Sequence, residues 1–332
     1  MSASSPLIVS PGDPSGIGPE IIGGAWQALR AENICFAVVG DADQLRGRGL
    51  EVQAIEALSQ APGVFPQAVP VLHSPLGVPA VPGQPSSKAA PAIIEWIRQA
   101  TELCLSGQAA GLVTAPIAKA TLYDSGFSYP GHTEYLGALT ADTPLAGERG
   151  PIMMLAVDGL RTTLVTIHKP LSEVASAISS DSIVHAGLVT AQALTRDFAI
   201  VNPRIAVAGL NPHAGESGTI GREEVEIIEP AIAQLKTLGV NATGPYPADS
   251  LFTSEHRHRY DAALCMYHDQ ALIPVKMLDF WGGVNVSLGL PIVRTSPDHG
   301  TAFDIAGTGK ARSDSMTAAI RMARQIADSR AR

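Results

Sequence analysis

Residues 204–213 read RIAVAGLNPH, an apolar, β-branched strand pattern that runs into a loop carrying a histidine. The same arrangement occurs twice more, because LRTTLVTI (160–167) leads to His168 and AALCMY (262–267) leads to His268. Such strands alternate along the chain with helical patterns. The alternation predicts an α/β fold with a mostly parallel or mixed sheet and helices on both faces.

The remaining elements follow from apolar periodicity and from Gly and Pro punctuation. The expected strands cover 6–10, 34–39, 69–72, 111–115, 204–210, 262–267, 284–288 and 291–295, and the expected helices cover 19–30, 86–105, 171–179, 182–197, 222–237 and 312–330. PIMMLAV and LRTTLVTI flank Asp158-Gly159, which predicts a hairpin with positive φ at both turn residues. Acidic residues in the first turn of 222–237 suit the helix dipole.

Composition limits the classes of function. The 332 residues are 45% hydrophobic and 16% charged, which is typical of a globular chain too long for one core, so two domains are expected. A net charge of -8 argues against nucleic-acid binding. Cys35, Cys104 and Cys265 lie in apolar runs and form no disulfide or metal-binding pattern. With no signal peptide and no apolar run near 18 residues, the sequence predicts a cytoplasmic protein without a membrane partner.

The three histidines that follow strands are the main candidates for chemistry. In open α/β sheets, ligands bind beyond the carboxyl ends of the strands. One histidine there more often has a structural role, whereas His168, His213 and His268 together favour a shared metal or active site. Imidazole suits zinc, cobalt and related ions.

Other candidates lie in three short segments. PGHTE (130–134) offers the His132 ring and the Thr133 hydroxyl, although Thr133 could instead cap a helix. Asp249 in YPADSLF (246–252) is expected in a loop, either as a turn residue or as a carboxylate beside a metal or for proton transfer. HDQALIPVK (268–276) is expected to be an apolar loop carrying Asp269 and Lys276.

Two cations and one glycine-rich loop point to anion binding. Lys276 and Arg294 lie in apolar stretches, where they form either a structural ion pair or a clamp for phosphate or carboxylate. Asn285, Asp298 and His299 lie in the same region as Arg294. GDPSGIGPE (12–20) is not a Rossmann fingerprint, although its backbone N–H groups could face an anion.

Taken together, these segments resemble the PdxA family, the 4-hydroxythreonine-4-phosphate dehydrogenases. The matching stretches are GDPSGIGPEI (12–21), PGHTEYL (130–136), TIHKPL (166–171), GLNPHAGESGTIG (209–221), GPYPADSLF (244–252), MYHDQALIPVK (266–276) and 283–311. The resemblance implies a two-domain α/β/α fold similar to isocitrate and isopropylmalate dehydrogenases, with the active site in the interdomain cleft at a dimer interface. The expected domains are 1–125 plus 285–332, and 126–284 with the metal histidines.

The resemblance also implies roles for individual residues. His168, His213 and His268 match ligands of one divalent ion per subunit (Zn, Mg or Co), in a metal site shared between the subunits of a homodimer. The positions that match substrate contacts are His132, Thr133, Lys276, Asn285 and Arg294. Asp249 and Lys276 match catalytic positions. The implied cofactor is NAD or NADP, with Gly12, Gly16, Asp298 and His299 as candidate contacts.

The implied reaction is oxidation of a phosphorylated hydroxy amino acid, 4-hydroxy-L-threonine phosphate, at C3, followed by decarboxylation, in pyridoxal 5'-phosphate biosynthesis. Four alternatives stay open. PdxA-like relatives oxidise 4-phospho-D-erythronate or 4-phospho-D-threonate, and others oxidise cyclic dihydrodiols. Three histidines and an aspartate would also serve a metal-dependent hydrolase or aldolase, and the same site could belong to a sugar-acid sensor without catalysis.

Overall fold

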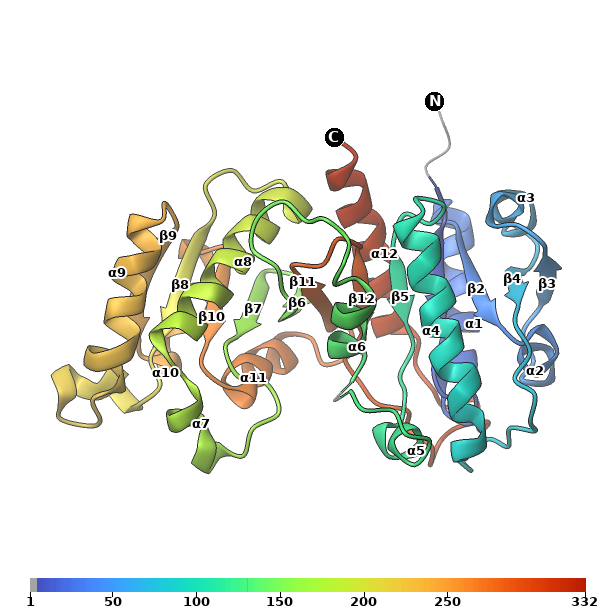
Figure 1. Ribbon diagram of the computed structural model, residues 1–332, viewed down its shortest axis with the longest axis horizontal. Coiled ribbons are helices and arrows are strands. Elements are labelled where there is room, and N and C mark those ends of the chain that lie inside the picture. Colours follow the sequence, from blue (N-terminus) through green and yellow to red (C-terminus); the bar gives the residue numbers. More distant parts are fainter. Residues whose placement is uncertain (1–4, 130) are drawn as a thin grey trace. The chain divides into compact units, whose positions relative to one another are not determined.

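The computed structural model describes residues 5–129 and 131–332, and its elements are labelled in Figure 1. The chain divides into two compact units, which are described separately. Unit 1 comprises residues 1–143 and 291–331, and unit 2 comprises residues 144–290. Strands and helices alternate in both units, which confirms the predicted α/β class.

Unit 1 contains a parallel sheet in the order β3-β4-β2-β1-β5-β12. The strands are β1 (Leu7–Ser10), β2 (Phe36–Gly40), β3 (Val52–Ile55), β4 (Val69–His73), β5 (Leu112–Thr114) and β12 (Arg294–Pro297). Its helices are α1 (Gly18–Leu29), α2 (Ala42–Gly47), α3 (Ala61–Val64), α4 (Ala90–Leu105), α5 (Lys119–Tyr123), α6 (His132–Leu139) and α12 (Asp314–Arg330). α4 contacts β1 and β5, and α12 contacts β12. Every residue of these three strands is buried, including the polar residues of β12.

Unit 2 contains a mixed sheet in the order β11-β6-β7-β10-β8-β9. The strands are β6 (Ile152–Val157), β7 (Leu160–Leu164), β8 (Arg204–Ala208), β9 (Asn241–Tyr246), β10 (Ala262–Cys265) and β11 (Val284–Leu288). β6 pairs antiparallel with β7 and β11, whereas β7, β10, β8 and β9 are mutually parallel. The helices are α7 (Leu171–Ala177), α8 (Ser180–Phe198), α9 (Glu229–Thr237), α10 (Ala248–Leu251) and α11 (His268–Leu278).

Several local predictions need correction. HDQALIPVK is not a loop but most of helix α11, which begins at His268 and contains Pro274. Asp249 lies in the one-turn helix α10 rather than in a loop. The Asp158-Gly159 hairpin is confirmed by the pairing of Val157 with Leu160, but only Gly159 has positive φ (76°). The helix expected at 222–237 begins as a π-helix at Glu224–Ile228 before it continues as α9.

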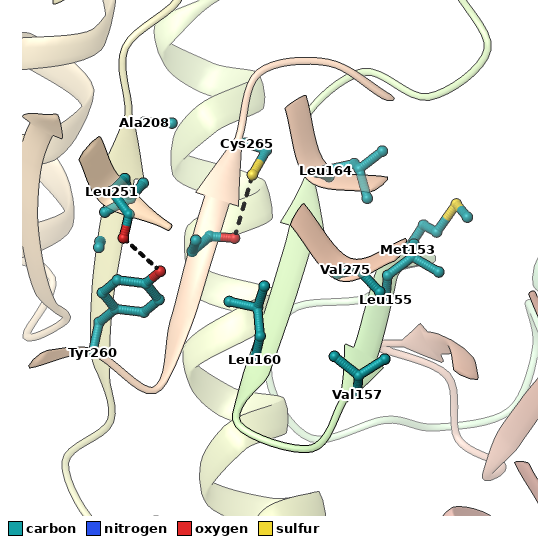
Figure 2. Packing of buried hydrophobic residues seen from close by; sticks show 13 residues of the cluster. Met153, Leu155, Val157, Leu160, Leu164, Ala208, Leu251, Tyr260, Cys265 and Val275 are labelled. Carbon is teal, nitrogen blue, oxygen red and sulfur yellow. Dashed lines mark hydrogen bonds between the residues drawn. The ribbon is translucent and has the colours of Figure 1, made fainter. Parts of the chain in front are cut away.

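Figure 2 shows the apolar cluster on which the strands of unit 2 depend. Leu155, Leu160 and Leu164 from the hairpin pack with Cys265 from β10 and with Val275 from α11. The Tyr260 hydroxyl donates to the Leu251 carbonyl at 3.1 Å, so this buried aromatic ring keeps a polar partner. Because α10 and α11 both contribute to the cluster, its packing fixes the helices that follow the strand ends.

In the described ranges, no single helix is long and apolar enough to span a membrane. α7 and α8 meet that criterion only as a pair, and they are bent by 90° at the break between them.

We predict that Leu155→Ala destabilises the protein by about 2–5 kcal/mol, because it removes a fully buried side chain from this cluster. The matched control is Leu171→Ala, since that side chain is 72% exposed. Urea unfolding followed by circular dichroism measures both changes. Equal stabilities for the two variants would show that the cluster does not support unit 2.

Candidate functional site

The four candidate ligands in unit 2 follow four adjacent parallel strands. His168, His268, His213 and Asp249 come after β7, β10, β8 and β9, which is the order of these strands in the sheet. Because the strands are parallel, their carboxyl ends lie at one edge of the sheet. The structure therefore brings the four segments to the edge where α/β proteins bind ligands.

His168 and His268 lie side by side, with their ring centroids 5.7 Å apart. The Nδ1 atom of His268 shares a hydrogen bond with Asp269 Oδ1 at 2.8 Å. A carboxylate on one ring nitrogen orients the ring and leaves Nε2 for another ligand, which is the arrangement found around metal-binding histidines. Asp269 is therefore a residue with a role that sequence reasoning did not assign.

Hydrogen bonds connect the loops at this edge to one another. Thr166 Oγ1 donates to the Met266 carbonyl at 2.7 Å. Gln270 Oε1 accepts from Met266 N–H and its Nε2 donates to the Gly209 carbonyl, both at 2.7 Å. Gly209 N–H donates to the Tyr246 carbonyl at 2.8 Å. The segments that lead to all four candidate ligands are thus fixed relative to their neighbours.

His213 begins an unusual turn. Residues 213–217 have φ values of 54°, 50°, 75°, 43° and 57°, all in the left-handed region, and only Gly215 is a glycine. L-residues pay roughly 1–2 kcal/mol each in this conformation, so surrounding contacts must hold the turn. No sequence signal predicts such a run at His, Ala, Glu and Ser.

The donor set fits a divalent ion in part. Imidazole nitrogens and a carboxylate are ordinary zinc or cobalt ligands, and His168 and His268 are already neighbours. Within residues 5–129 and 131–332, however, no three His, Cys, Asp or Glu side chains form a group that could hold a metal. The chain described here thus gathers two imidazoles, and His213 is brought to the same edge without joining them.

Two further candidates in unit 2 differ in environment. Lys276 lies on α11, half-buried, with Nζ 5.2 Å from the centre of the Phe280 ring. Asn285 lies on β11, and its Oδ1 atom is buried with no hydrogen-bond partner among the described residues. A buried carbonyl oxygen of this kind is costly unless a ligand donates to it.

The candidates for substrate contact in unit 1 centre on Arg294. This residue is 3% exposed and its Nη2 donates to Thr114 Oγ1 at 2.7 Å. Burial lowers the pKa of Arg294 to about 10, although the Glu134 carboxylate acts in the opposite direction. A buried guanidinium that stays protonated near neutral pH is well suited to an anionic ligand.

His132 is electrostatically coupled to Arg294. Its Nε2 atom is buried and lacks a hydrogen-bond partner among the described residues. Desolvation, followed by the charges of Arg294 and Lys119, holds the pKa of His132 well below its usual value. Gly131, not Thr133, is the N-cap of α6, so the capping interpretation of Thr133 is wrong. Pro130 of the PGHTE segment lies outside the described residues.

The four candidate cofactor contacts belong to two adjoining loops of unit 1. Ile17 N–H donates to the Thr301 carbonyl at 3.0 Å. Ile17 directly follows Gly16, and Thr301 lies two residues after His299, so this bond joins the two loops. Gly12 has φ of 73° and a Cβ there would lie 2.3 Å from the Pro116 carbonyl oxygen. A Cβ on Gly16 would lie 2.9 Å from the Thr301 carbonyl oxygen. Packing within the chain therefore accounts for both glycines.

Three buried polar residues were missed by sequence reasoning. Asp13 is 1% exposed in the loop after β1, where burial raises its pKa against the opposing effect of a hydrogen bond from Ser15 N–H. Gln270 and Glu224 are also buried. Glu224 was interpreted as an acid that suits the helix dipole, but its carboxylate contacts the loop before His213. The sequence carried no signal for these long-range contacts.

The fold is that of an α/β protein whose candidate ligand residues follow the carboxyl ends of four parallel strands, which is where such proteins bind ligands. Comparison with known proteins gives the particular family. The sequence model of the family described as pyridoxal phosphate biosynthetic protein PdxA matches residues 32–323 of this chain. The chain belongs to this family, which confirms the resemblance found in the sequence.

Individual relatives agree with this assignment. A 4-hydroxythreonine-4-phosphate dehydrogenase from Caulobacter vibrioides is 60% identical over 326 residues, which cover 98% of each chain. The crystal structure of the enzyme of that name from Klebsiella pneumoniae is 39% identical, with a TM-score of 0.86, over 98% of this chain and 100% of the other. A terephthalate 1,2-cis-dihydrodiol dehydrogenase from Burkholderia xenovorans is 28% identical, with a TM-score of 0.63, over 97% and 98%.

We predict that His132 makes stability fall in acid. Because its folded pKa is lowered, the unfolded state binds more protons once the pH drops below about 6.5, and stability is lost between that pH and the lower folded pKa. Urea unfolding at pH 7.5, 6.5 and 5.5 should show a smaller loss for His132→Gln than for the wild type. The exposed His258→Gln is the control, and identical pH dependence in all three proteins would refute the burial of a neutral imidazole.

Proposed function

We propose that this chain oxidises 4-hydroxy-L-threonine phosphate at C3 with NAD or NADP, as expected of a 4-hydroxythreonine-4-phosphate dehydrogenase in pyridoxal 5'-phosphate biosynthesis. The observation that carries the proposal is the histidine-bearing sheet edge of unit 2, in a chain 60% identical over nearly its full length to an enzyme of that name. A hydride leaves C3 for the nicotinamide and the hydroxyl proton leaves as well. The product, 2-amino-3-oxo-4-phosphooxybutanoate, then loses CO2 to give 3-amino-2-oxopropyl phosphate.

The chain's own residues have distinct roles in this proposal. Arg294 and Lys276 hold substrate anions, while His132, Thr133 and Asn285 orient the polar groups of the substrate. Asp249, in α10 directly after β9, is the candidate for accepting the hydroxyl proton. Lys276, on α11, is the second catalytic candidate, because its positive charge can hold the substrate anion in place during the reaction. Asp298 and His299, with the loop around Gly12 and Gly16, are the proposed cofactor contacts.

One divalent ion per subunit (Zn, Mg or Co) is held by His168, His213 and His268 in this proposal. When bound, such an ion acts as a Lewis acid that polarises the substrate oxygen. The distance of 5.7 Å between the ring centroids of His168 and His268 supports these two residues as ligands of one ion. His213, the third ligand, does not join these two among the described residues. This is consistent with a metal site that is completed by the second subunit of a homodimer.

The surface of α11 supports the homodimer. Ile273 and Met277 are 61% and 81% exposed, and Phe280 and Trp281 beyond the helix end are 60% and 49% exposed. Large apolar side chains gathered on one element favour contact with another protein surface. The same helix begins at His268 and carries Lys276, so a partner packed there would adjoin the proposed metal and substrate residues.

The alternative is another PdxA-like dehydrogenase, acting on 4-phospho-D-erythronate, 4-phospho-D-threonate or a related hydroxy acid. A dihydrodiol substrate is less well supported, because the relative with that name is 28% identical, against 60% for the 4-hydroxythreonine-4-phosphate dehydrogenase. We place the protein in the cytoplasm, since Cys35, Cys104 and Cys265 are all free thiols.

We expect purified protein to reduce NAD+ or NADP+ when given 4-hydroxy-L-threonine phosphate, and to lose this activity when the metal is chelated. Absorbance at the reduced nicotinamide band measures turnover across a panel that includes both phosphorylated sugar acids and a dihydrodiol. Adding back Zn2+, Co2+ or Mg2+ should restore the rate. Full turnover in metal-free protein would contradict the metal site, and preference for a sugar acid would select the alternative.

We also predict that Arg294→Lys raises KM for a phosphorylated substrate roughly 10- to 150-fold, because a charge-assisted hydrogen bond contributes about 1.5–3 kcal/mol and tenfold corresponds to 1.4 kcal/mol. Lysine keeps the charge but lacks the planar fork of donors. The matched control is Arg321→Lys, an exposed arginine paired with Glu32 in the same unit. A variant with an unchanged KM and a lowered Tm would make Arg294 a purely structural residue.

A further inference from the structure

The turn that begins at His213 is held by one buried carboxylate. Glu224 is 1% exposed, and its Oε1 atom accepts hydrogen bonds from the backbone N–H groups of Leu210 and Asn211, both at 2.7 Å. Its Oε2 atom accepts from Asn211 Nδ2 at 2.9 Å. These three bonds fix the two residues that lead directly into the turn.

The carboxylate also sits against the turn itself. A Cβ on Gly215 would lie 2.5 Å from Glu224 Oε2, so the turn and the acid are in close contact at its centre. A Cβ on Gly209 would lie 3.1 Å from Oε1 and 3.0 Å from Ala214. The left-handed run at 213–217 is therefore wrapped around Glu224, which supplies the contacts that an unfavourable backbone conformation needs.

A second buried side chain fixes where this loop lies. Gln270, on α11, donates to the Gly209 carbonyl and accepts from Met266 N–H. Gly209 is four residues before His213, and Met266 is two residues before His268. One amide group thus connects the two histidine-bearing loops, using its donor and its acceptor at the same time.

We propose that Glu224 is a positioning residue that shapes the turn presenting His213, and that Gln270 sets the place of that turn relative to His268. Neither residue is one of the proposed metal ligands. The inference rests on the proposed function only in taking His213 as a metal ligand. The strained backbone at 213–217 then serves to hold the His213 imidazole in place. An imidazole held in this way loses less conformational freedom when it binds an ion.

The test compares Glu224→Gln with Glu226→Gln in full-length, metal-free protein. In Glu224→Gln, the amide NH2 group faces the Asn211 Nδ2 donor, so that hydrogen bond is lost. One oxygen remains to accept from the N–H groups of Leu210 and Asn211. Glu226 is a matched control in the same helical segment, because its carboxylate pairs with Arg222 at 2.5 Å and is 58% exposed. Co2+ titration followed by calorimetry and by the visible absorption of the ion gives the affinity.

We expect Glu224→Gln to bind Co2+ about 10- to 100-fold more weakly, as is typical when a supporting partner of a metal ligand is lost, and Glu226→Gln to bind as the wild type does. Backbone hydrogen exchange over 209–220 should rise in Glu224→Gln alone. If Glu224→Gln folds poorly, Gln270→Met, which removes both hydrogen bonds at similar size, should show the same weakening.

The outcomes separate the two claims. Wild-type affinity for Co2+ in both Glu224→Gln and Gln270→Met would overturn the positioning role. Unchanged exchange over 209–220 in Glu224→Gln would overturn the view that the carboxylate holds the turn. If the wild-type protein binds no Co2+, the metal part of the proposed function and the positioning role both fail, while a rise in exchange in Glu224→Gln would still support the claim that the carboxylate holds the turn.

Discussion

The rest of unit 2 depends on the pairing of four parallel strands, β7, β10, β8 and β9, which forces four chain segments to end at one edge of a sheet. Parallel strands leave their last carbonyl and N–H groups without partners at that edge, and buried groups of this kind must be bonded. Here the side chains of Thr166 and Gln270 donate to the carbonyls of Met266 and Gly209, and Gly209 N–H donates to the Tyr246 carbonyl. The same bonds that satisfy the backbone therefore also fix the residues that follow the strands.

This arrangement explains why rigid and strained features occur together. The apolar cluster beneath the edge includes residues of the hairpin, β10 and α11, so the helix that starts at His268 is anchored by packing. The turn at His213 adopts five left-handed conformations in succession, so contacts from outside the turn must hold it. A buried carboxylate and a buried amide supply the missing contacts. In unit 1, Arg294 is likewise kept in the interior by a hydrogen bond to Thr114 from the neighbouring strand β5.

Much of this could be predicted from the sequence, for physical reasons. The strand-loop-histidine pattern at 160–168, 204–213 and 262–268 is local, and parallel pairing follows from the helices between the strands. The order of the strands, which brings the three histidines to neighbouring positions, depends on long-range pairing. The sequence could therefore only suggest it. Helix α11 was taken for a loop because Pro274 and an apolar run obscure its helical periodicity. Glu224 and Gln270 could not be found, since their partners lie 14 and 61 residues away.

We propose that the carboxyl ends of β7, β10, β8 and β9 bind a divalent ion that serves oxidation of a phosphorylated hydroxy acid. The most direct measurement is anomalous X-ray diffraction at the cobalt edge from crystals of the Co2+-loaded protein. The account predicts a single strong peak per chain within coordination distance of the Nε2 atoms of both His168 and His268. A peak elsewhere on the chain, or no peak at these two rings in protein that turns over substrate, would contradict it.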